Sequence, residues 1–364
     1  MTHIAFALEQ AYGHILPTLG IAIELIKRGN RVSYVVTRNF SVGVKRIGAN
    51  ALTFEPLVTR PAMLESINDR DEKVFGDLRL AKTENSMSQL EMLFRKDPPD
   101  LIVHDAIEDF AARSLALRWG IPHVRFCPAP LDSMVEVDLL REFAEDSIVL
   151  VAVPRFFSDS PPMVGNTRVE VVGFIPEGRN EFFEPWRPSQ GSEKTILASV
   201  TTGIMPQVEF CRIVIEAFRN EPYRVVLSIG GLDEVSRITP SGLGDLPDNV
   251  VLNQGSSNFD ILRNASLLIT QGGQGSVLEA LFHGVPVLGV PSYRWDEEAC
   301  QRIVELGLGS RLDFANISAY SLRGHFHVLL NDHETLSRVR KIRQQMQEVH
   351  GAKTAADVIE KYLH

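Results

Sequence analysis

The chain has 364 residues, of which 44% are hydrophobic and 23% charged, a composition typical of a globular protein with room for two domains. Its 37 basic and 46 acidic residues give a net charge of −9, which argues against nucleic acid as a main partner. Three widely spaced cysteines indicate neither a disulfide framework nor a zinc site, and no apolar run reaches the roughly 20 residues that span a bilayer.

The first half alternates apolar, β-branched segments with helical ones. Strands are predicted at residues 3–9, 31–37, 51–57, 100–104 and 122–127, and helices at 15–27, 41–48 and 110–119. Segments 147–154 and 169–175 are candidates to extend the same sheet, whereas 61–96 is polar and only partly helical in pattern. Strands that alternate with helices at this interval predict a parallel, doubly wound sheet. The chain enters its first strand at once, with no signal-peptide pattern, so we expect a cytoplasmic protein.

A segment rich in proline, glycine and charge, residues 176–194, is typical of a linker. The alternation then restarts, with strands predicted at 195–200, 223–229, 249–254, 266–270 and 286–291 and helices at 207–219 and up to 264. We therefore expect an N-terminal domain at 1–178, a linker at 179–193, a C-terminal domain at 194–345 and a tail at 346–364. The tail is amphipathic and helical, with a break predicted near Gly351, and is a candidate to pack back on the N-terminal domain.

The turn after the strand at 266–270 has the pattern of an anion site. It reads Gln271-Gly272-Gly273-Gln274-Gly275-Ser276 and leads into a helix that should end at Gly284. Glycines allow close approach of the backbone, and free N–H groups at a helix N-terminus face a phosphate. The turn matches neither the Walker loop nor the dinucleotide fingerprint, and such turns also serve plain helix–strand packing. On the turn alone, both interpretations stay open.

Three separated stretches together resemble one family. They are Gly13-His14-Ile15-Leu16-Pro17-Thr18-Leu19 after the first strand, Asp105 after the strand at 100–104, and the turn described above running into PSYRWDEEACQRIVELGLG. This combination resembles the nucleotide-sugar-dependent glycosyltransferases that modify macrolides and other small molecules. The resemblance implies a GT-B fold of two facing Rossmann-like domains, with the acceptor bound by the N-terminal half and the donor by the C-terminal half. It covers nearly the whole chain and is weakest at 61–96 and 131–167.

In that family the histidine of the first loop is the catalytic base, which implies this role for His14. Alone, His14 would be interpreted as a surface histidine beside a turn, and Asp105 as a helix N-cap. The pair in family register favours His14 as the base and Asp105 as the group that orients it. His104 should point to the other side of its strand and serve packing.

The resemblance also implies a donor site for a UDP- or dTDP-sugar. Its residues are Thr202, Asn258, Gln271, Gly273, Gly275, Ser276, Glu279, Asp296 and Glu297. The glycine turn and Ser276 would hold the diphosphate, with Thr202 nearby, and Glu279 would hold the ribose. Asp296 and Glu297 would bind sugar hydroxyls, although the first turn of a solvated helix explains this acidic pair equally well.

Three positions depart from the family pattern. Gln271 stands where the family usually has histidine, and Glu297 where it has glutamine. The family's aromatic residue that often stacks on the base corresponds to a position near Gly255 of this chain, and the polar partner of that aromatic residue to a position near Asn258. Because of these changes, the resemblance does not settle the identity of the nucleotide and of the sugar. His14 and Asp105 keep the family pattern.

We therefore predict an inverting, metal-independent glycosyltransferase with no cofactor besides the nucleotide sugar. The partner is a small-molecule acceptor with a free hydroxyl, and a homodimer is one candidate assembly. The run Asp69-Arg70-Asp71 imitates the metal motif of another glycosyltransferase fold but lies in a polar stretch, and we interpret it as a solvated charge cluster. Two alternatives stay open, a nucleotide-sugar 2-epimerase of the same fold and an inactive auxiliary subunit.

Overall fold

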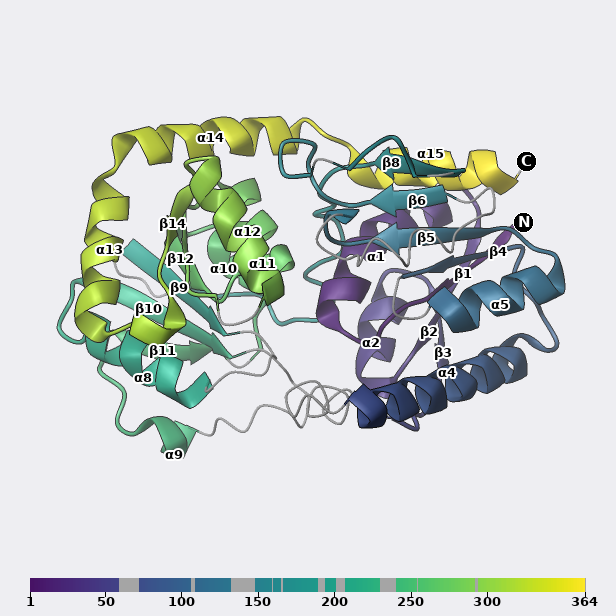
Figure 1. Ribbon diagram of the computed structural model, residues 1–364, viewed down its shortest axis with the longest axis horizontal. Coiled ribbons are helices and arrows are strands. Elements are labelled where there is room, and N and C mark those ends of the chain that lie inside the picture. The colour runs from purple at the N-terminus through teal and green to yellow at the C-terminus, as the bar shows by residue number, and fades with distance from the viewer. Residues whose placement is uncertain are drawn as a thin grey trace. The chain divides into compact units, whose positions relative to one another are not determined.

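The computed structural model describes residues 1–58, 72–105, 109–131, 148–158, 160–164, 166–188, 194–200, 207–229, 240–253, 255–291 and 294–363 (Figure 1). The chain forms two compact units. Unit 1 comprises Met1–Phe182 and Val349–His364, and unit 2 comprises Phe183–Glu348. Each unit contains a mainly parallel sheet with packed helices, so the predicted α/β class with two parallel-sheet units and a helical tail is confirmed.

Unit 1 has an eight-stranded sheet in the order β3-β2-β1-β4-β5-β6-β8-β7. Its strands are β1 (His3–Ala7), β2 (Arg31–Val36), β3 (Asn50–Thr53), β4 (Leu101–His104), β5 (His123–Cys127), β6 (Ile148–Val151), β7 (Met163–Val164) and β8 (Thr167–Val171). Its helices are α1 (Tyr12–Lys27), α2 (Arg38–Arg46), α4 (Glu72–Phe94), α5 (Asp109–Trp119) and α15 (Gly351–Leu363). Among the described strands every pairing is parallel except the short β7–β8 hairpin, which the sequence did not predict.

The two faces of this sheet are covered by different helices. On one face Ala5, Ala7 and Ile102 form a core with residues of α4 and α5. On the other face Phe6 stacks on Tyr34, whose hydroxyl is hydrogen-bonded to Thr18 of α1 at 2.8 Å. Strands that are buried on both faces read as continuous apolar runs, which is why the sequence indicates them clearly.

The C-terminal helix α15 packs on α1, the first helix of the chain. Arg28 at the end of α1 forms ion pairs with Asp357 at 2.7 Å and Glu360 at 2.8 Å. Gly351 begins the helix where a β-carbon would lie 2.9 Å from the carbonyl oxygen of Val172. The predicted break near Gly351 is present, and α15 belongs to unit 1 although it follows unit 2 in sequence.

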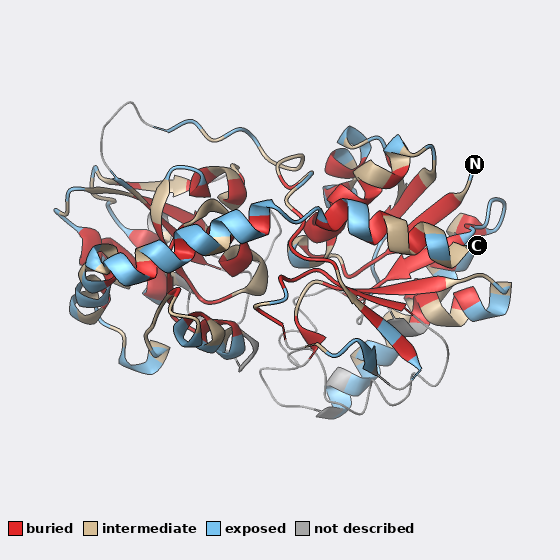
Figure 2. Ribbon diagram, turned by 90° about the horizontal axis from the view of Figure 1, so that it is seen from above, coloured by how far each residue is buried: buried red, intermediate tan, exposed pale blue. Residues whose placement is uncertain are grey.

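Unit 2 has a six-stranded sheet in the order β11-β10-β9-β12-β13-β14, and its described pairings are all parallel. Its strands are β9 (Lys194–Val200), β10 (Tyr223–Ile229), β11 (Val250–Asn253), β12 (Ala265–Thr270), β13 (Val287–Gly289) and β14 (Gly309–Arg311). Its helices are α8 (Gln207–Phe218), α9 (Pro240–Leu243), α10 (Asn258–Leu262), α11 (Gln274–His283), α12 (Arg294–Glu305), α13 (Ala319–Asn331) and α14 (His333–Gln347), with a 3-10 turn at Phe314–Asn316. Figure 2 shows the central strands of each unit buried, and the outward sides of helices such as α14 exposed.

Several helix starts differ from the prediction, among them that of α2, which begins at Arg38 rather than at residue 41. Helix α1 begins at Tyr12, three residues earlier than expected, so His14 lies in its first turn. The residue before it, Ala11, caps the helix without a side-chain hydrogen bond, so no capping residue marks this start in the sequence. Helix α11 begins at Gln274, inside the glycine turn. In the described part of the chain, no helix is both long and apolar enough to cross a membrane.

Candidate active site

His14 and Asp105 lie together at the carboxyl edge of the unit 1 sheet. Strands β1 and β4 are parallel neighbours, so the start of α1 after β1 and the residue that follows β4 meet at one edge. Nδ1 of His14 lies 2.8 Å from Oδ2 of Asp105. The aspartate side chain is fully buried, whereas the histidine side chain is 18% exposed. The imidazole is therefore held by a buried carboxylate and is still open to solvent.

The hydrogen bonds define what this pair can do. Oδ2 of Asp105 accepts a second hydrogen bond, from the backbone N–H of Glu9 at 2.7 Å. An ionised carboxylate only accepts hydrogen bonds, so Nδ1 of His14 is the donor and Nε2 of the neutral ring carries the lone pair. Nε2 can then take a proton, and the carboxylate stabilises the imidazolium that forms.

The loop that leads to His14 is held by Gln10, which sequence analysis did not single out. Its side-chain amide donates to the carbonyls of Leu8 at 2.8 Å and Val35 at 3.2 Å. Its side-chain oxygen accepts from the backbone N–H of Thr37 at 2.7 Å. Gln10 thus ties together the carboxyl ends of β1 and β2. The one signal in the sequence is a polar residue soon after a buried strand.

Two other polar groups near the pair have partners of their own. The carboxylate of Glu9 forms an ion pair with Lys82 of α4. His104 is fully buried, and its Nε2 lies 3.1 Å from Nδ1 of His123 on β5. Because side chains alternate along a strand, His104 belongs to the face opposite Asp105. This agrees with the packing role predicted for it.

In unit 2 the glycine turn joins β12 to α11 and rests on α12. Gly272 has φ +103°, a conformation that favours glycine, and a β-carbon there would lie 2.7 Å from the carbonyl oxygen of Asp296. Gly273 caps α11 without a side-chain hydrogen bond, and the first turn of this helix holds no acidic residue. Beyond its chain neighbours and its own helix backbone, a β-carbon at Gly275 would meet no atom of the described residues within 4 Å. The helix N-terminus therefore has room and a favourable dipole for an anion.

The remaining residues of this region differ in exposure. Gln271 is only 1% exposed, so its side-chain amide is buried. Ser276 is half-buried in the first turn of α11, and Glu279 is 7% exposed about one turn further on. Gly284 ends the helix with φ +76°, as predicted. Gln274 was not predicted as a site residue, and its buried Nε2 has no hydrogen-bond partner among the residues that the structure describes.

The acidic pair lies in the first turn of α12, beside the glycine turn. Burial raises the pKa of Asp296 to about 6. Glu297 is 53% exposed and lies 4.0 Å from Arg311. The backbone contact between Asp296 and Gly272 therefore brings the predicted sugar-binding residues next to the predicted diphosphate loop.

Asn258 begins α10, and its side-chain amide donates to the hydroxyl of Ser199 near the end of β9 at 2.9 Å. Its side-chain oxygen is buried, with no hydrogen-bond partner in the described part of the chain. A β-carbon at Gly255, near which the family has an aromatic residue, would meet no atom of the described residues within 4 Å beyond its chain neighbours. Thr202 and the Asp69–Asp71 cluster lie outside the described residues. Within the described ranges no three His, Cys, Asp or Glu side chains gather as metal ligands, and metal independence stays a prediction.

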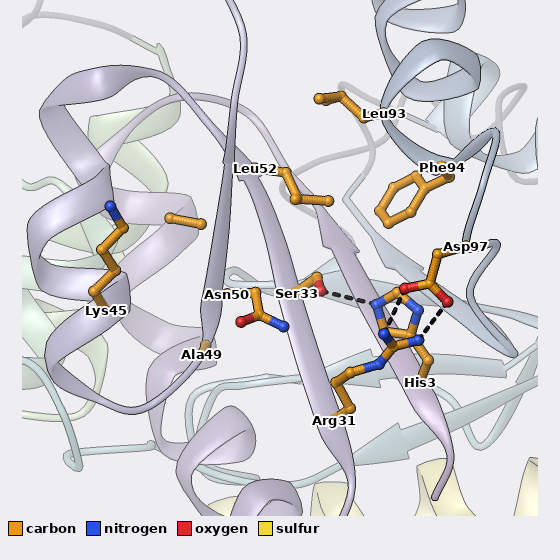
Figure 3. Close-up of a pocket in the computed structure, with 11 residues that line it drawn as sticks. His3, Arg31, Ser33, Lys45, Ala49, Asn50, Leu52, Leu93, Phe94 and Asp97 are labelled. Carbon is orange, nitrogen blue, oxygen red and sulfur yellow. Dashed lines mark hydrogen bonds and ion pairs between the residues drawn. The ribbon is translucent and has the colours of Figure 1, made fainter.

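A separate cavity of about 320 Å³ lies at the amino edge of the unit 1 sheet. In Figure 3 the Arg31 guanidinium faces the Asp97 carboxylate, with one contact at 2.7 Å, and His3 reaches Ser33 at 2.8 Å. Burial lowers the pKa of His3, which is 3% exposed. None of the predicted site residues lines this cavity, and parallel α/β sheets bind ligands at the opposite, carboxyl edge.

Comparison with known proteins identifies the family. Residues 229–361 match the model of the erythromycin biosynthesis protein CIII-like C-terminal domain. NDP-glycosyltransferase YjiC of Bacillus licheniformis is 30% identical, with 99% of this chain and 98% of the relative covered. Demethyllactenocin mycarosyltransferase of Streptomyces fradiae is 28% identical over 100% of this chain and 87% of its own.

Two solved structures extend the likeness to the fold. The glycosyltransferase of kitacinnamycin is 27% identical with a TM-score of 0.80, covering 100% of this chain and 99% of its own. The calicheamicin glycosyltransferase CalG4 is 28% identical with a TM-score of 0.74, covering 100% and 98%. The chain belongs to the nucleotide-sugar-dependent, GT1-like natural-product glycosyltransferases of GT-B fold. It is a glycosyltransferase of the macrolide type, as its sequence predicted.

Proposed function

We propose that this enzyme transfers a sugar, with inversion and without a metal ion, from a UDP- or dTDP-sugar to a hydroxyl of a small, natural-product-like acceptor. The observation that carries the proposal is the 2.8 Å contact between His14 and the buried Asp105. Support for the acceptor class comes from relatives named for demethyllactenocin and for oleandomycin, the latter 28% identical over 99% of this chain.

In the proposed reaction His14 acts as the general base. Nε2 removes the proton of the acceptor hydroxyl as its oxygen forms a bond to the anomeric carbon. The bond from that carbon to the diphosphate oxygen breaks, and the nucleoside diphosphate leaves with the electron pair. Asp105 keeps the imidazole in the required tautomer and stabilises its positive charge. One displacement of this kind inverts the anomeric configuration.

Unit 2 would hold the donor. The N-terminus of α11, with Gly273, Gly275 and Ser276, suits the diphosphate, because its dipole and N–H groups stabilise the charge that develops on departure. Gln271 would donate to the same phosphates. The remaining assignments are Glu279 and Asn258 to the nucleoside, Thr202 to the diphosphate region, and Asp296 and Glu297 to the sugar.

A nucleotide screen followed by product analysis tests the proposal. The unfolding temperature is measured with UDP, dTDP, GDP and ADP, and we expect UDP or dTDP to raise it because a ligand of the folded state stabilises that state. The matching nucleotide sugars are then incubated with acceptor mixtures, products are detected by mass spectrometry, and NMR gives the anomeric configuration. Absence of any shift favours an auxiliary subunit, and sugar-nucleotide turnover without acceptor favours an epimerase.

A further inference from the structure

A second carboxylate, that of Glu9, lies next to the His14–Asp105 pair. The backbone N–H of Glu9 and Nδ1 of His14 contact the same oxygen, Oδ2 of Asp105, at 2.7 Å and 2.8 Å. The Glu9 carboxylate belongs to the residue whose backbone N–H contacts Asp105. Its negative charge therefore lies within about one Debye length, roughly 10 Å, of the imidazole. This charge is matched by a cation, since the Glu9 carboxylate forms an ion pair with Lys82.

Lys82 reaches Glu9 because of its place on helix α4. Ser86, Leu90 and Phe94 follow at intervals of four residues, and all three are buried. Residues four apart lie on one helix face, so Lys82 continues this inward stripe toward the N-terminus of the helix. The Lys82 side chain is 21% exposed and that of Glu9 12% exposed. Charges on side chains that are mostly shielded from water interact more strongly than charges on the surface.

We propose that Lys82 is a positioning residue for the transfer reaction. Its positive charge neutralises Glu9, so that one net negative charge, that of Asp105, acts on His14. The inference rests on the proposed role of His14 as the base. The charged groups that the described elements bring to His14 are Asp105 after β4, Glu9 after β1 and Lys82 on α4. Without the lysine, two carboxylates would favour the imidazolium, and less free base would be present at neutral pH.

Two single variants should move the titration of His14 in opposite directions. Lys82→Met leaves Glu9 uncompensated, and we expect the titration midpoint of His14 to rise by about 0.5–1 pH unit. Glu9→Gln removes a negative charge near the imidazole while Lys82 keeps its positive charge, and we expect a fall of similar size. The double variant should return close to the wild-type midpoint, and Lys82→Arg should keep it. NMR of histidine-labelled protein measures the midpoint, with the His14 signal assigned by its loss in His14→Ala.

Kinetics link this titration to the reaction. The acidic side of the kcat/KM profile reports protonation of the free base, so it should shift with the NMR midpoint in each variant. Unmoved midpoints in Glu9→Gln and in a folded Lys82 variant overturn the inference, whatever the base is. Opposite shifts that the kinetic profile follows support it. Opposite shifts with an unmoved kinetic profile instead remove His14 as the base, and with it the part of Lys82 in the reaction. If Lys82→Met does not fold, Lys82→Gln and Glu9→Gln provide the same comparison.

Discussion

Gly272 lies so close to Cys300 that a β-carbon on the glycine would stand 2.4 Å from Sγ of the cysteine. The same sulfur would lie 2.5 Å from a β-carbon at Gly289 of β13. Cys300 is fully buried and fills the space that the two glycines leave under the turn. The packing of Cys300 against Gly272 therefore fixes the conformation of the turn. The space for a ligand lies on the side of Gly275.

This difference predicts opposite phenotypes for two glycine variants. Gly272→Ala should lower the free energy of unfolding by about 1–3 kcal/mol, because it strains a backbone with positive φ and clashes with Cys300. Gly275→Val should keep the fold, since a β-carbon at this position meets no other atom of the described residues within 4 Å beyond its chain neighbours and its own helix backbone, but it should block the diphosphate. Thermal unfolding and calorimetry with UDP and dTDP measure both effects. A folded Gly275→Val protein with unchanged nucleotide affinity would show that the loop is wrongly assigned.

Gln271 should contribute a neutral hydrogen bond to the diphosphate. We expect Gln271→Ala to weaken nucleotide binding by about 1–3 kcal/mol, the range for a hydrogen bond to a charged group. The isosteric variant Gln271→Glu should weaken it further, because it places a carboxylate beside the phosphates. Unchanged affinity in both variants, measured by calorimetry, would mean that the side chain does not contact the donor, and the auxiliary-subunit alternative would gain weight.

Asp296 should make both stability and donor binding depend on pH. Burial raises its pKa from 3.8 to about 6, so between these values the folded state binds a proton that the unfolded state releases. Stability therefore falls as pH rises through this window, and the cost is fully present above pH ~6. Asp296→Asn should raise the free energy of unfolding by about 1–3 kcal/mol at pH 7 and change it little below pH ~4. Denaturant unfolding at several pH values measures this difference.

The sugar contact predicts a second effect of the same group. A carboxylate accepts hydrogen bonds from sugar hydroxyls, so the affinity for UDP- or dTDP-sugar should fall as pH drops below about 6. The affinity for the nucleoside diphosphate without sugar should change less, which provides the control. An equal pH dependence for both ligands would place Asp296 away from the sugar.

The strands and their order of appearance were predictable because buried parallel strands are continuous apolar runs. β1, β2, β9 and β10 stand out for this reason. β14, with the sequence Gly-Ser-Arg, was not predicted, because three residues without a large apolar side chain carry no such signal. Short edge strands of this kind form through tertiary pairing rather than through local preference.

For the candidate site, the sequence predicted which residues lie at the same edge of a sheet. His14 and Asp105 were paired because both match the family pattern and each follows a strand of one parallel sheet, and the structure brings their side chains within hydrogen-bond distance. The ties of Gln10 to the backbone and of Glu9 to Lys82 were not predictable, since they depend on which way side chains turn after the strand ends. Likewise, the contact of Cys300 with Gly272 joins residues far apart in sequence, with no local pattern that links them.

Asp105→Asn should reduce turnover by a similar or smaller factor than loss of His14. The amide keeps the shape of the side chain but removes the charge that stabilises the imidazolium. The losses of the two single variants should not add in the double variant, because the residues act as one unit. Turnover of the three variants at saturating donor measures this, and additive losses would show that the two side chains act separately.

The most direct test of the account is turnover by His14→Ala, with donor affinity measured in parallel by calorimetry. Removal of a general base should lower turnover by roughly 10²–10⁴-fold. The dissociation constant of the nucleotide sugar should stay unchanged, because the lost interaction belongs to the transition state and to the acceptor. Turnover near the wild-type rate would contradict the account and move the search for the base to another group.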